Sequence, residues 1–299
     1  MRELNENEQS DILTDMTPDT LIHAIEENAA AFLLALGRTG GGDERDDSEI
    51  TWTIGGSPLS YHNAVVRANL APQTADALIL ASRERMAAYG VPGSWHVSPS
   101  MRHDDLGQRL IAAGFTYSGN EPGMAVDLHA LNEDASMPES LTIQRVRSAA
   151  DIAIWAATLN ANGFGEGAIE SEWVGAMYER LGCGDETPWR HYLGLLDSEP
   201  VTTSTLFLGA GVAGIYFVSV HPDARRRGIG AALTLAPLRA ARELGYRVGV
   251  LGASALGEPV YRRLGFTAYC QIALYEWSLP IDATSPDSYT YENWRKTSI

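Results

Sequence analysis

The sequence of 299 residues is poor in cysteine and lacks an apolar leader. Its two cysteines, Cys183 and Cys270, are too few for a disulfide scaffold and have no CxxC spacing of the kind that binds zinc or forms a redox pair. We therefore expect no metal site and two reduced, buried thiols. Residues 1–8 are acidic and have no signal-peptide core, which predicts a cytoplasmic protein.

Basic residues are also scarce, because 22 Lys and Arg stand against 38 Asp and Glu, giving a net charge of −16. Such a surface repels a phosphate backbone, so we expect neither DNA nor RNA as a partner. A cationic amine would be attracted, although many soluble proteins carry an acidic surface without that function.

Long apolar runs are missing, and only residues 201–220 approach the length of a membrane span without a charge. Strand-forming residues fill this stretch, and Gly209-Ala210-Gly211 interrupts it. That pattern predicts a β-hairpin, so no transmembrane segment and no membrane partner are expected.

What the sequence does contain is an α/β (α+β) pattern that occurs twice. Strand, helix, strand and helix are followed by Gly114-Phe115 in the first half and by Gly265-Phe266 in the second. The economical explanation is two copies of one fold, in residues 1–135 and 140–280, with a tail at 281–299. A chance recurrence of such common elements is the alternative. Between a first helix that ends at Gly37 and the first strand, the glycine-rich acidic residues 40–47 predict a surface loop.

The most informative pattern is an apolar strand followed by a turn with two closely spaced glycines, Gly228 and Gly230, and then by a long helix. The first turn of a helix has unpaired N–H groups and the positive end of the macrodipole, and glycines let a phosphate approach the backbone. No Lys-Ser or Lys-Thr of a Walker loop follows, and the third glycine of a dinucleotide fingerprint is absent. The pattern predicts a diphosphate site, whereas the alternative is a solvated basic turn at residues 225–227.

Arg225, Gly228 and Gly230 match the R/Q-x-x-G-x-G/A motif of the GNAT N-acetyltransferases, which the chain resembles. The resemblance implies two GNAT-like domains, each with a mixed, mostly antiparallel sheet flanked by helices. It implies acetyl-CoA, or another short acyl-CoA, as co-substrate, with the diphosphate on the turn and the pantetheine arm along a preceding strand that splays from its neighbour. The cofactor-binding residues implied in this way are Val218, Ser219, Val220, Arg225, Arg226, Arg227, Gly228, Ile229, Gly230, Ala231 and Ser254.

A later segment resembles the family's N-x-x-A-x-x-x-Y-x-x-x-G-F motif, with Ser254 at the Asn position and Tyr261 at the Tyr position. The resemblance implies that Tyr261 is catalytic and protonates the departing CoA thiolate. The alternative is a half-buried tyrosine whose hydroxyl is merely satisfied. In the first half no glycine pair follows Pro72, so we expect that half not to bind CoA but to support the second half or to form a wall of the acceptor pocket.

The resemblance implies that the primary amine of a small molecule attacks the thioester directly in a ternary complex. An alkylammonium must first lose a proton, and neither strand beside the expected cleft contains a carboxylate that could accept it. The candidates for this base are His221, Glu166, Glu170 and Glu172, of which Glu166 lies in a polar loop at residues 160–167 that is expected to line the acceptor pocket.

Two other functions stay open from the sequence. One is a protein or peptide N-acetyltransferase, and the other is a catalytically silent acyl-CoA-binding sensor or scaffold. The missing strand carboxylate favours the silent protein, whereas the retained Tyr261 disfavours it. The acceptor, the acyl-chain preference and the oligomeric state, a homodimer included, are not decided by the sequence.

Overall fold

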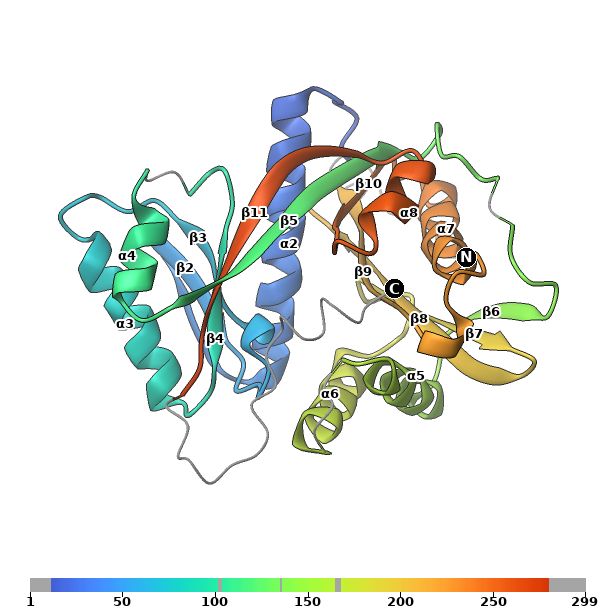
Figure 1. Cartoon of the computed structure of the whole chain (residues 1–299), viewed down its shortest axis with the longest axis horizontal. Coiled ribbons are helices and arrows are strands. Elements are labelled where there is room, and N and C mark those ends of the chain that lie inside the picture. The colour runs from blue at the N-terminus through green and yellow to red at the C-terminus, as the bar shows by residue number, and fades with distance from the viewer. Residues whose placement is uncertain (1–11, 102–103, 135, 165–167, 280–299) are drawn as a thin grey trace.

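One sheet runs through both halves of the chain, where two separate sheets were expected. The structure is a computed structural model that describes residues 12–101, 104–134, 136–164 and 168–279. Within these ranges, 11 strands are ordered β1-β2-β3-β4-β11-β5-β10-β9-β8-β7-β6 (Figure 1). The helices pack around this sheet, and the mixed, mostly antiparallel α/β class is as predicted.

The elements of the first half are α2 (Pro18–Gly40), β1 (Asp43–Asp46), β2 (Ile50–Ile54), η1 (Ser60–His62), β3 (Asn63–Ala68), α3 (Ala75–Ala88), β4 (Gly93–Val97), α4 (Leu106–Ala112) and β5 (Thr116–Asp127). Those of the second half are β6 (Leu141–Arg145), α5 (Ala149–Ala161), α6 (Ala168–Leu181), β7 (Trp189–Leu196), β8 (Glu199–Gly209), β9 (Val212–Val220), η2 (Pro222–Ala224), α7 (Ile229–Glu243), β10 (Val248–Gly252), α8 (Glu258–Arg263) and β11 (Thr267–Trp277).

The two halves repeat one order of elements about the middle of the sheet. Strand β3 is parallel to β4, and β9 is parallel to β10. Helices α3 and α7 connect these pairs, and α4 and α8 then lead to β5 and β11. The recurrence read from the sequence is therefore present in the topology.

The last strand of each half lies beside the other half. Strand β11 pairs antiparallel with β4, where Leu274 lies opposite His96. Strand β5 pairs antiparallel with β10, where Gly252 lies opposite Gly123. Because β5 and β11 also pair with each other, each half completes its sheet with a strand of the other. The boundary at residues 135–140 stays a prediction, since no observation tests it.

Helix α2 also joins the halves, because it crosses the middle of the sheet and contacts strands of both (Figure 1). The ring of Phe32 stacks on that of Tyr216 in β9, with centroids 3.7 Å apart. The Asn28 amide donates to the carbonyl oxygen of Gly209 at 2.8 Å and accepts from the Tyr216 hydroxyl at 2.7 Å. The first half therefore fixes the strand that leads to the expected CoA site.

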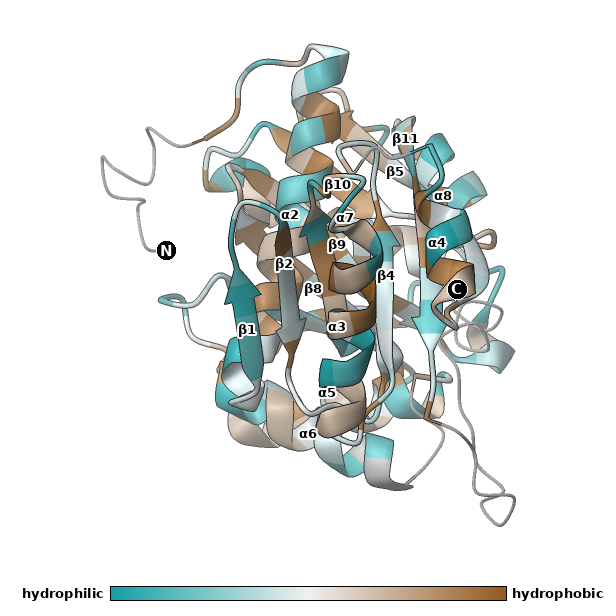
Figure 2. Ribbon diagram, turned by 90° about the vertical axis from the view of Figure 1, so that its left-hand side faces the viewer, coloured by the Kyte–Doolittle hydropathy of each residue, from teal (hydrophilic) through white to brown (hydrophobic). Residues whose placement is uncertain are grey.

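Two local predictions in the first half are wrong. Gly37 does not end α2, which continues to Gly40. The helix is capped by Gly41, which has the left-handed conformation at φ 70°. Gly37 instead allows close packing, since a Cβ atom there would lie 1.5 Å from Thr53 Oγ1. Residues 40–47 are not all loop, because β1 forms the edge of the sheet beside β2. This strand is hydrophilic (Figure 2), and charged residues on an edge strand hinder pairing with other chains.

The predicted hairpin at residues 201–220 is confirmed as β8 and β9. At its turn, Ala210 and Gly211 have positive φ values of 52° and 71°. In the described ranges of the chain, no helix is both long enough and apolar enough to cross a membrane.

Candidate functional site

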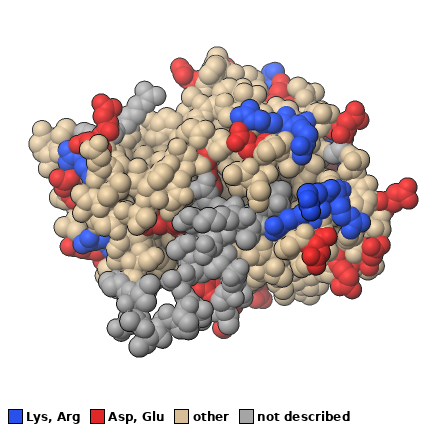
Figure 3. Space-filling view, in the orientation of Figure 1, with Lys and Arg blue, Asp and Glu red and all other residues tan. Residues whose placement is uncertain are grey.

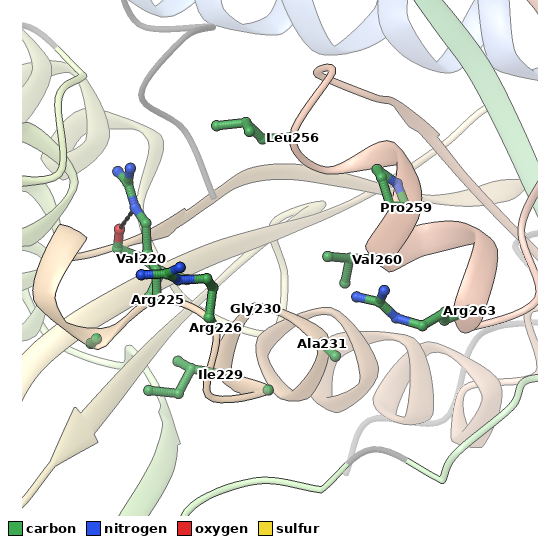
Figure 4. Close-up of a pocket in the computed structure, with 12 residues that line it drawn as sticks. Val220, Arg225, Arg226, Ile229, Gly230, Ala231, Leu256, Pro259, Val260 and Arg263 are labelled. Carbon is green, nitrogen blue, oxygen red and sulfur yellow. Dashed lines mark hydrogen bonds between the residues drawn. The ribbon is translucent and has the colours of Figure 1, made fainter.

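A pocket of about 530 Å³ lies between the turn that follows β9 and helix α8 (Figure 4). The strand end, the turn and the first residues of α7 form one side, and α8 with its preceding loop forms the other. The lining residues are Val220, Ala224, Arg225, Arg226, Gly228, Ile229, Gly230, Ala231, Leu256, Pro259, Val260 and Arg263.

Gly228 gives the turn its shape, because it precedes α7 in the left-handed conformation at φ 79°. That conformation favours glycine, which has no Cβ atom to clash. A Cβ atom on Gly228 would also lie 1.9 Å from the carbonyl oxygen of Ser136, in the segment that connects the halves. Both the backbone conformation and the neighbouring chain therefore require glycine here.

The first turn of α7 presents backbone N–H groups at the pocket. In the part of the chain that the structure describes, no side chain caps this helix. Its first intrahelical bond runs from the N–H of Ala232 to the carbonyl oxygen of Gly228 at 3.1 Å. The N–H groups of Ile229, Gly230 and Ala231 therefore lack intrahelical partners and lie at the positive end of the macrodipole, as a phosphate site requires.

Arginines add positive charge to this pocket. The Nε–H of Arg225 donates to the carbonyl oxygen of Val220 at 3.0 Å, which ties the turn to the strand end (Figure 4), and burial lowers the pKa of Arg225. Arg226 is exposed and also lines the pocket, whereas Arg227 is exposed but does not line it. Figure 3 shows basic side chains gathered over the second half on this face of the protein.

Arg263 was not among the residues expected from the sequence, although it lines the pocket and points from α8 toward the turn (Figure 4). Its place depends on how α8 packs against α7, which no local motif reveals. The neighbouring Arg262, in contrast, pairs with Glu258 at 2.6 Å along the same helix.

Strands β9 and β10 separate beside the pocket, as predicted. They pair only where Ala213 lies opposite Gly249 and Gly214 opposite Val250. Strand β9 then continues to Val220, while the end of β10 pairs with β5. The two strands thus open toward the turn, which leaves room for a ligand arm between them.

A bulge bends β9 within this opening, at a shift in its register with β8. Phe217 lies in the bulge with φ 52°, a value that costs a non-glycine residue about 1 kcal/mol. Val218 and Ser219 follow with buried side chains, and the Ser219 hydroxyl accepts from the Asn162 amide at 2.9 Å. Of the three strand residues expected to contact the pantetheine arm, only Val220 lines the pocket, so the contacts of the other two stay predictions.

Residues 188–268, from the strand before β8 to the start of β11, match the family model described as the acetyltransferase (GNAT) domain. This part of the chain is therefore a GNAT acetyltransferase domain. The matched region contains the turn, the separated strands and α8, which together build the pocket.

Two curated GNAT relatives match a short part of the chain. A mycothiol acetyltransferase of Saccharomonospora viridis is 46% identical over 63 residues, which are 20% of this chain and 21% of that protein. A mycothiol acetyltransferase of Pseudarthrobacter chlorophenolicus is 37% identical over 67 residues, which are 21% of each protein. The chain thus matches about a fifth of the length of these relatives.

Solved structures resemble more of the chain. A GCN5-related N-acetyltransferase from Kribbella flavida has a TM-score of 0.62 at 19% identity, covering 83% of this chain and 93% of that one. A tandem GNAT protein from the clavulanic acid biosynthesis pathway has a TM-score of 0.53 at 16% identity, covering 78% and 79%. At these identities the likeness concerns the fold alone.

Tyr261 of the GNAT motif is buried on α8, with 5% of its surface exposed, and its ring lies 5.9 Å from that of Phe266. Burial raises its pKa, and the charge of Glu121 raises it further. The hydroxyl is therefore protonated at neutral pH, as a proton donor must be. Ser254 has a local role, since its hydroxyl accepts from the N–H of Gly257 at 3.1 Å; its predicted contact with the cofactor stays untested.

Glu121 is the functional candidate that sequence reasoning missed. It lies on β5 with 9% of its surface exposed, and its Oε2 atom is 3.2 Å from the position of a Cβ atom on Gly252 at the end of β10. Burial raises the pKa of both Tyr61 and Tyr261, and the charge of Glu121 raises each of them further. The sequence signal for Glu121 was a charged residue directly before the apolar stretch 122–126. Its strand belongs to the first half, which was expected not to bind CoA.

The residues that the sequence offered as the general base do not line the phosphate pocket in the described part of the chain. His221 is half-exposed, and its Nδ1 atom accepts from the N–H of Asp223 at 3.4 Å at the start of η2. Glu170 and Glu172 lie on α6 outside the phosphate pocket. Glu166 lies outside the described residues.

Two smaller expectations near this site need correction. The predicted loop at residues 160–167 begins inside α5, and Phe164 is buried with its ring 5.0 Å from that of Phe217. Cys183 is partly exposed instead of buried, whereas Cys270 is buried as predicted. Among the described side chains, no group of three potential metal ligands occurs.

Proposed function

We propose that the second half transfers an acetyl, or another short acyl, group from acyl-CoA to the primary amine of a small molecule. The observation that carries this proposal is the turn before α7, where left-handed Gly228 places the N–H groups of three residues around a pocket beside separated strands. The diphosphate of CoA has the charge and size that this arrangement favours. The name of the curated relatives, mycothiol acetyltransferase, supports a small-molecule acceptor.

The residues at the pocket fit acyl-CoA as a substrate. The unpaired N–H groups and Arg226 would hold the diphosphate, while Arg263 on the opposite wall would neutralise a further phosphate. Leu256 and Val260 supply an apolar surface beside the expected path of the pantetheine arm. The site thus combines the polar and apolar contacts that this substrate needs.

In the reaction that we propose, the amine nitrogen attacks the carbonyl carbon of the thioester within a ternary complex. The new C–N bond forms as the C–S bond breaks, and the Tyr261 hydroxyl gives its proton to the departing thiolate. Glu121 accepts one proton from the ammonium before attack, and the second N–H proton, lost as the amide forms, passes to the Tyr261 phenolate. Solvent then takes the proton from Glu121, so neither residue is consumed and one proton is released per turnover.

The first half has a supporting role in this proposal. Its α3 is preceded by Thr74 at φ −106°, and no glycine pair follows the strand that leads to it, so a phosphate cradle like that of α7 is missing. In our proposal it supplies Glu121 and supports the second half, since the buried ring of His62 stacks on that of Trp173 in α6 at 5.2 Å.

The proposed activity is tested by thiol release from acetyl-CoA in the presence of a panel of small amines and amine-terminated peptides. We expect turnover with at least one small hydrophilic amine and slower turnover with peptides. Tight binding of acetyl-CoA without turnover on any amine would identify a silent acyl-CoA-binding protein instead. Faster turnover of peptides would contradict the small-molecule acceptor.

A further inference from the structure

A second pocket, of about 470 Å³, lies near the C-terminal end of α7 and is lined by three arginines. Arg145 ends β6, Arg147 follows it, and Arg190 lies on β7. The remaining lining residues are Asp185, Tyr192, Ala240, Glu243 and Leu244. Because a helix of the length of α7 spans about 22 Å, this pocket is separate from the phosphate turn at the other end of the helix.

Two of these three guanidinium groups pair with one carboxylate, that of Asp185. Asp185 accepts a short hydrogen bond from Arg145 through Oδ1, and its Oδ2 lies 3.6 Å from Arg147. Arg190 donates only to backbone carbonyl oxygens, those of Thr187 at 3.2 Å and Asp185 at 3.4 Å. In the ranges that the structure describes, Glu243 forms no ion pair with them, so the pocket holds an excess of positive charge.

One of these positive charges is buried, since only 7% of the surface of Arg190 is exposed. A buried guanidinium that is not paired with an anion is unfavourable, since it has lost water without gaining an opposite charge. Burial and the charge of Arg145 accordingly lower the pKa of Arg190. In addition, the Nε atom of Arg145 is buried without a hydrogen-bond partner among the described residues.

We infer that this pocket binds a phosphate group, as the phosphomonoester of a small molecule. Guanidinium groups present several N–H donors in a plane that matches phosphate oxygens, and the anion would offset the excess positive charge that three arginines and two carboxylates leave in the pocket. The pocket is larger than a phosphate ion, and Ala240 with Leu244 provides an apolar side for the organic part. This inference does not depend on acyl transfer, because none of its residues lines the pocket assigned to acyl-CoA.

Calorimetric titration of the full chain with inorganic phosphate, at constant ionic strength, tests the inference. Arg147→Gln is the main variant, since 62% of its side chain is exposed and its replacement should not disturb folding. Arg190→Gln removes the buried cation, with circular dichroism as the check of its fold. Ala231→Asp, which places a carboxylate at the first turn of α7, is the matched control at the other pocket.

We expect saturable binding of phosphate that is at least tenfold weaker in Arg147→Gln and in folded Arg190→Gln, and changed less than twofold in Ala231→Asp. An absence of saturable binding by the unaltered protein would overturn the inference. Loss of binding in Ala231→Asp with retention in Arg147→Gln would place the phosphate at the turn before α7 and overturn it equally. Tighter binding of succinate than of phosphate would overturn the choice of ligand.

Discussion

At the scale of single residues, Tyr261 and Glu121 come from different halves, and the pKa of Tyr261 is raised by burial and then by the charge of Glu121. Replacing Tyr261 with Phe removes the hydroxyl that we assign to protonation of the thiolate, while the buried ring and its contact with Phe266 are kept. We expect kcat to fall by about 100-fold or more, the usual effect of losing a general acid. The affinity for acetyl-CoA, measured by calorimetry, should be unchanged, and an unchanged kcat would remove the proposed role.

Glu121→Gln tests the proposed base with little change of shape. Turnover of an amine that is protonated at neutral pH should fall by about 100-fold or more, because the ammonium proton then has no acceptor. Glu276→Gln is the matched control, since Glu276 is also buried on a central strand but accepts from Ser118 at 2.5 Å and from Ser60. An equal loss in the two variants would show that Glu121 supports the fold only.

Buried histidines predict how stability depends on pH. Burial lowers the pKa of His62 and His191 from 6.5 to about 3, so both are neutral in the folded chain. Below pH 6.5 the unfolded chain binds these protons and the folded chain does not, so the free energy of unfolding falls with pH until about pH 3. Each histidine contributes up to about 1.4 kcal/mol per pH unit within this window.

Urea unfolding between pH 7.5 and 5 measures this dependence. We expect a shallower slope in His191→Gln than in the unaltered protein, with the half-exposed His221→Gln as control. Equal slopes in all three proteins would contradict the assignment of a neutral, buried His191.

The residues of the candidate site differ in how far the sequence reveals them. Gly228, Gly230 and Arg225 lie within a few positions of one another, and their spacing predicts a local structure that needs no partner. Arg263 and Glu121 reach the site only through the packing of α8 and the pairing of β5. A search for a base on β9 and β10 could not find Glu121, because the carboxylate lies on a strand that comes more than 80 residues earlier in the sequence than β9.

At the scale of elements, most helices and strands follow from periodicity and turn residues, but the exchange of β5 and β11 does not. Both strands follow a Gly-Phe pair, and either could pair with its own half through the same backbone hydrogen bonds. Register depends on long-range contacts, such as the approach of Gly123 to Cys270. Edge strand β1 was not predicted either, because its composition is typical of loops and it forms a strand only through its pairing with β2.

Gly123→Val tests the exchanged pairing. A Cβ atom there would lie 2.5 Å from Cys270 Sγ and 2.9 Å from Ile25 Cγ2, so overpacking should lower the free energy of unfolding by about 1–3 kcal/mol. Because β5 borders both halves, both should unfold in a single transition, and the variant should need less denaturant to reach its midpoint. Gly175→Ala in α6 is the control, as its Cβ atom would meet nothing within 4 Å. Two separate transitions, one of them unshifted, would contradict the structural role of β5.

At the scale of the whole molecule, the halves share one sheet but divide the chemistry. The second half binds acyl-CoA in our proposal, and the first contributes the base and helix α2, which holds β9 through Asn28 and Phe32. The loss of the glycine turn from the first half is consistent with this division, since its strands and helices are kept while the phosphate cradle is not. The arginines at the turn also place positive charge locally on a chain whose net charge is −16.

The most direct test of the central claim is the binding of acetyl-CoA at the first turn of α7. Gly228 is a poor site for this test, because any Cβ atom would strike the backbone of Ser136. Ala231 lines the same pocket, and an acidic residue in the first turn of a helix does not disfavour the helix itself.

Calorimetric titration should therefore compare the unaltered chain with Ala231→Asp and with the uncharged Ala231→Asn. We expect Ala231→Asp to weaken acetyl-CoA at least about 100-fold, since two like charges in contact near a protein surface repel by about 4 kcal/mol. Ala231→Asn should bind within a few-fold of the unaltered chain. Equal affinity in Ala231→Asp and Ala231→Asn would contradict the placement of the CoA diphosphate at this turn.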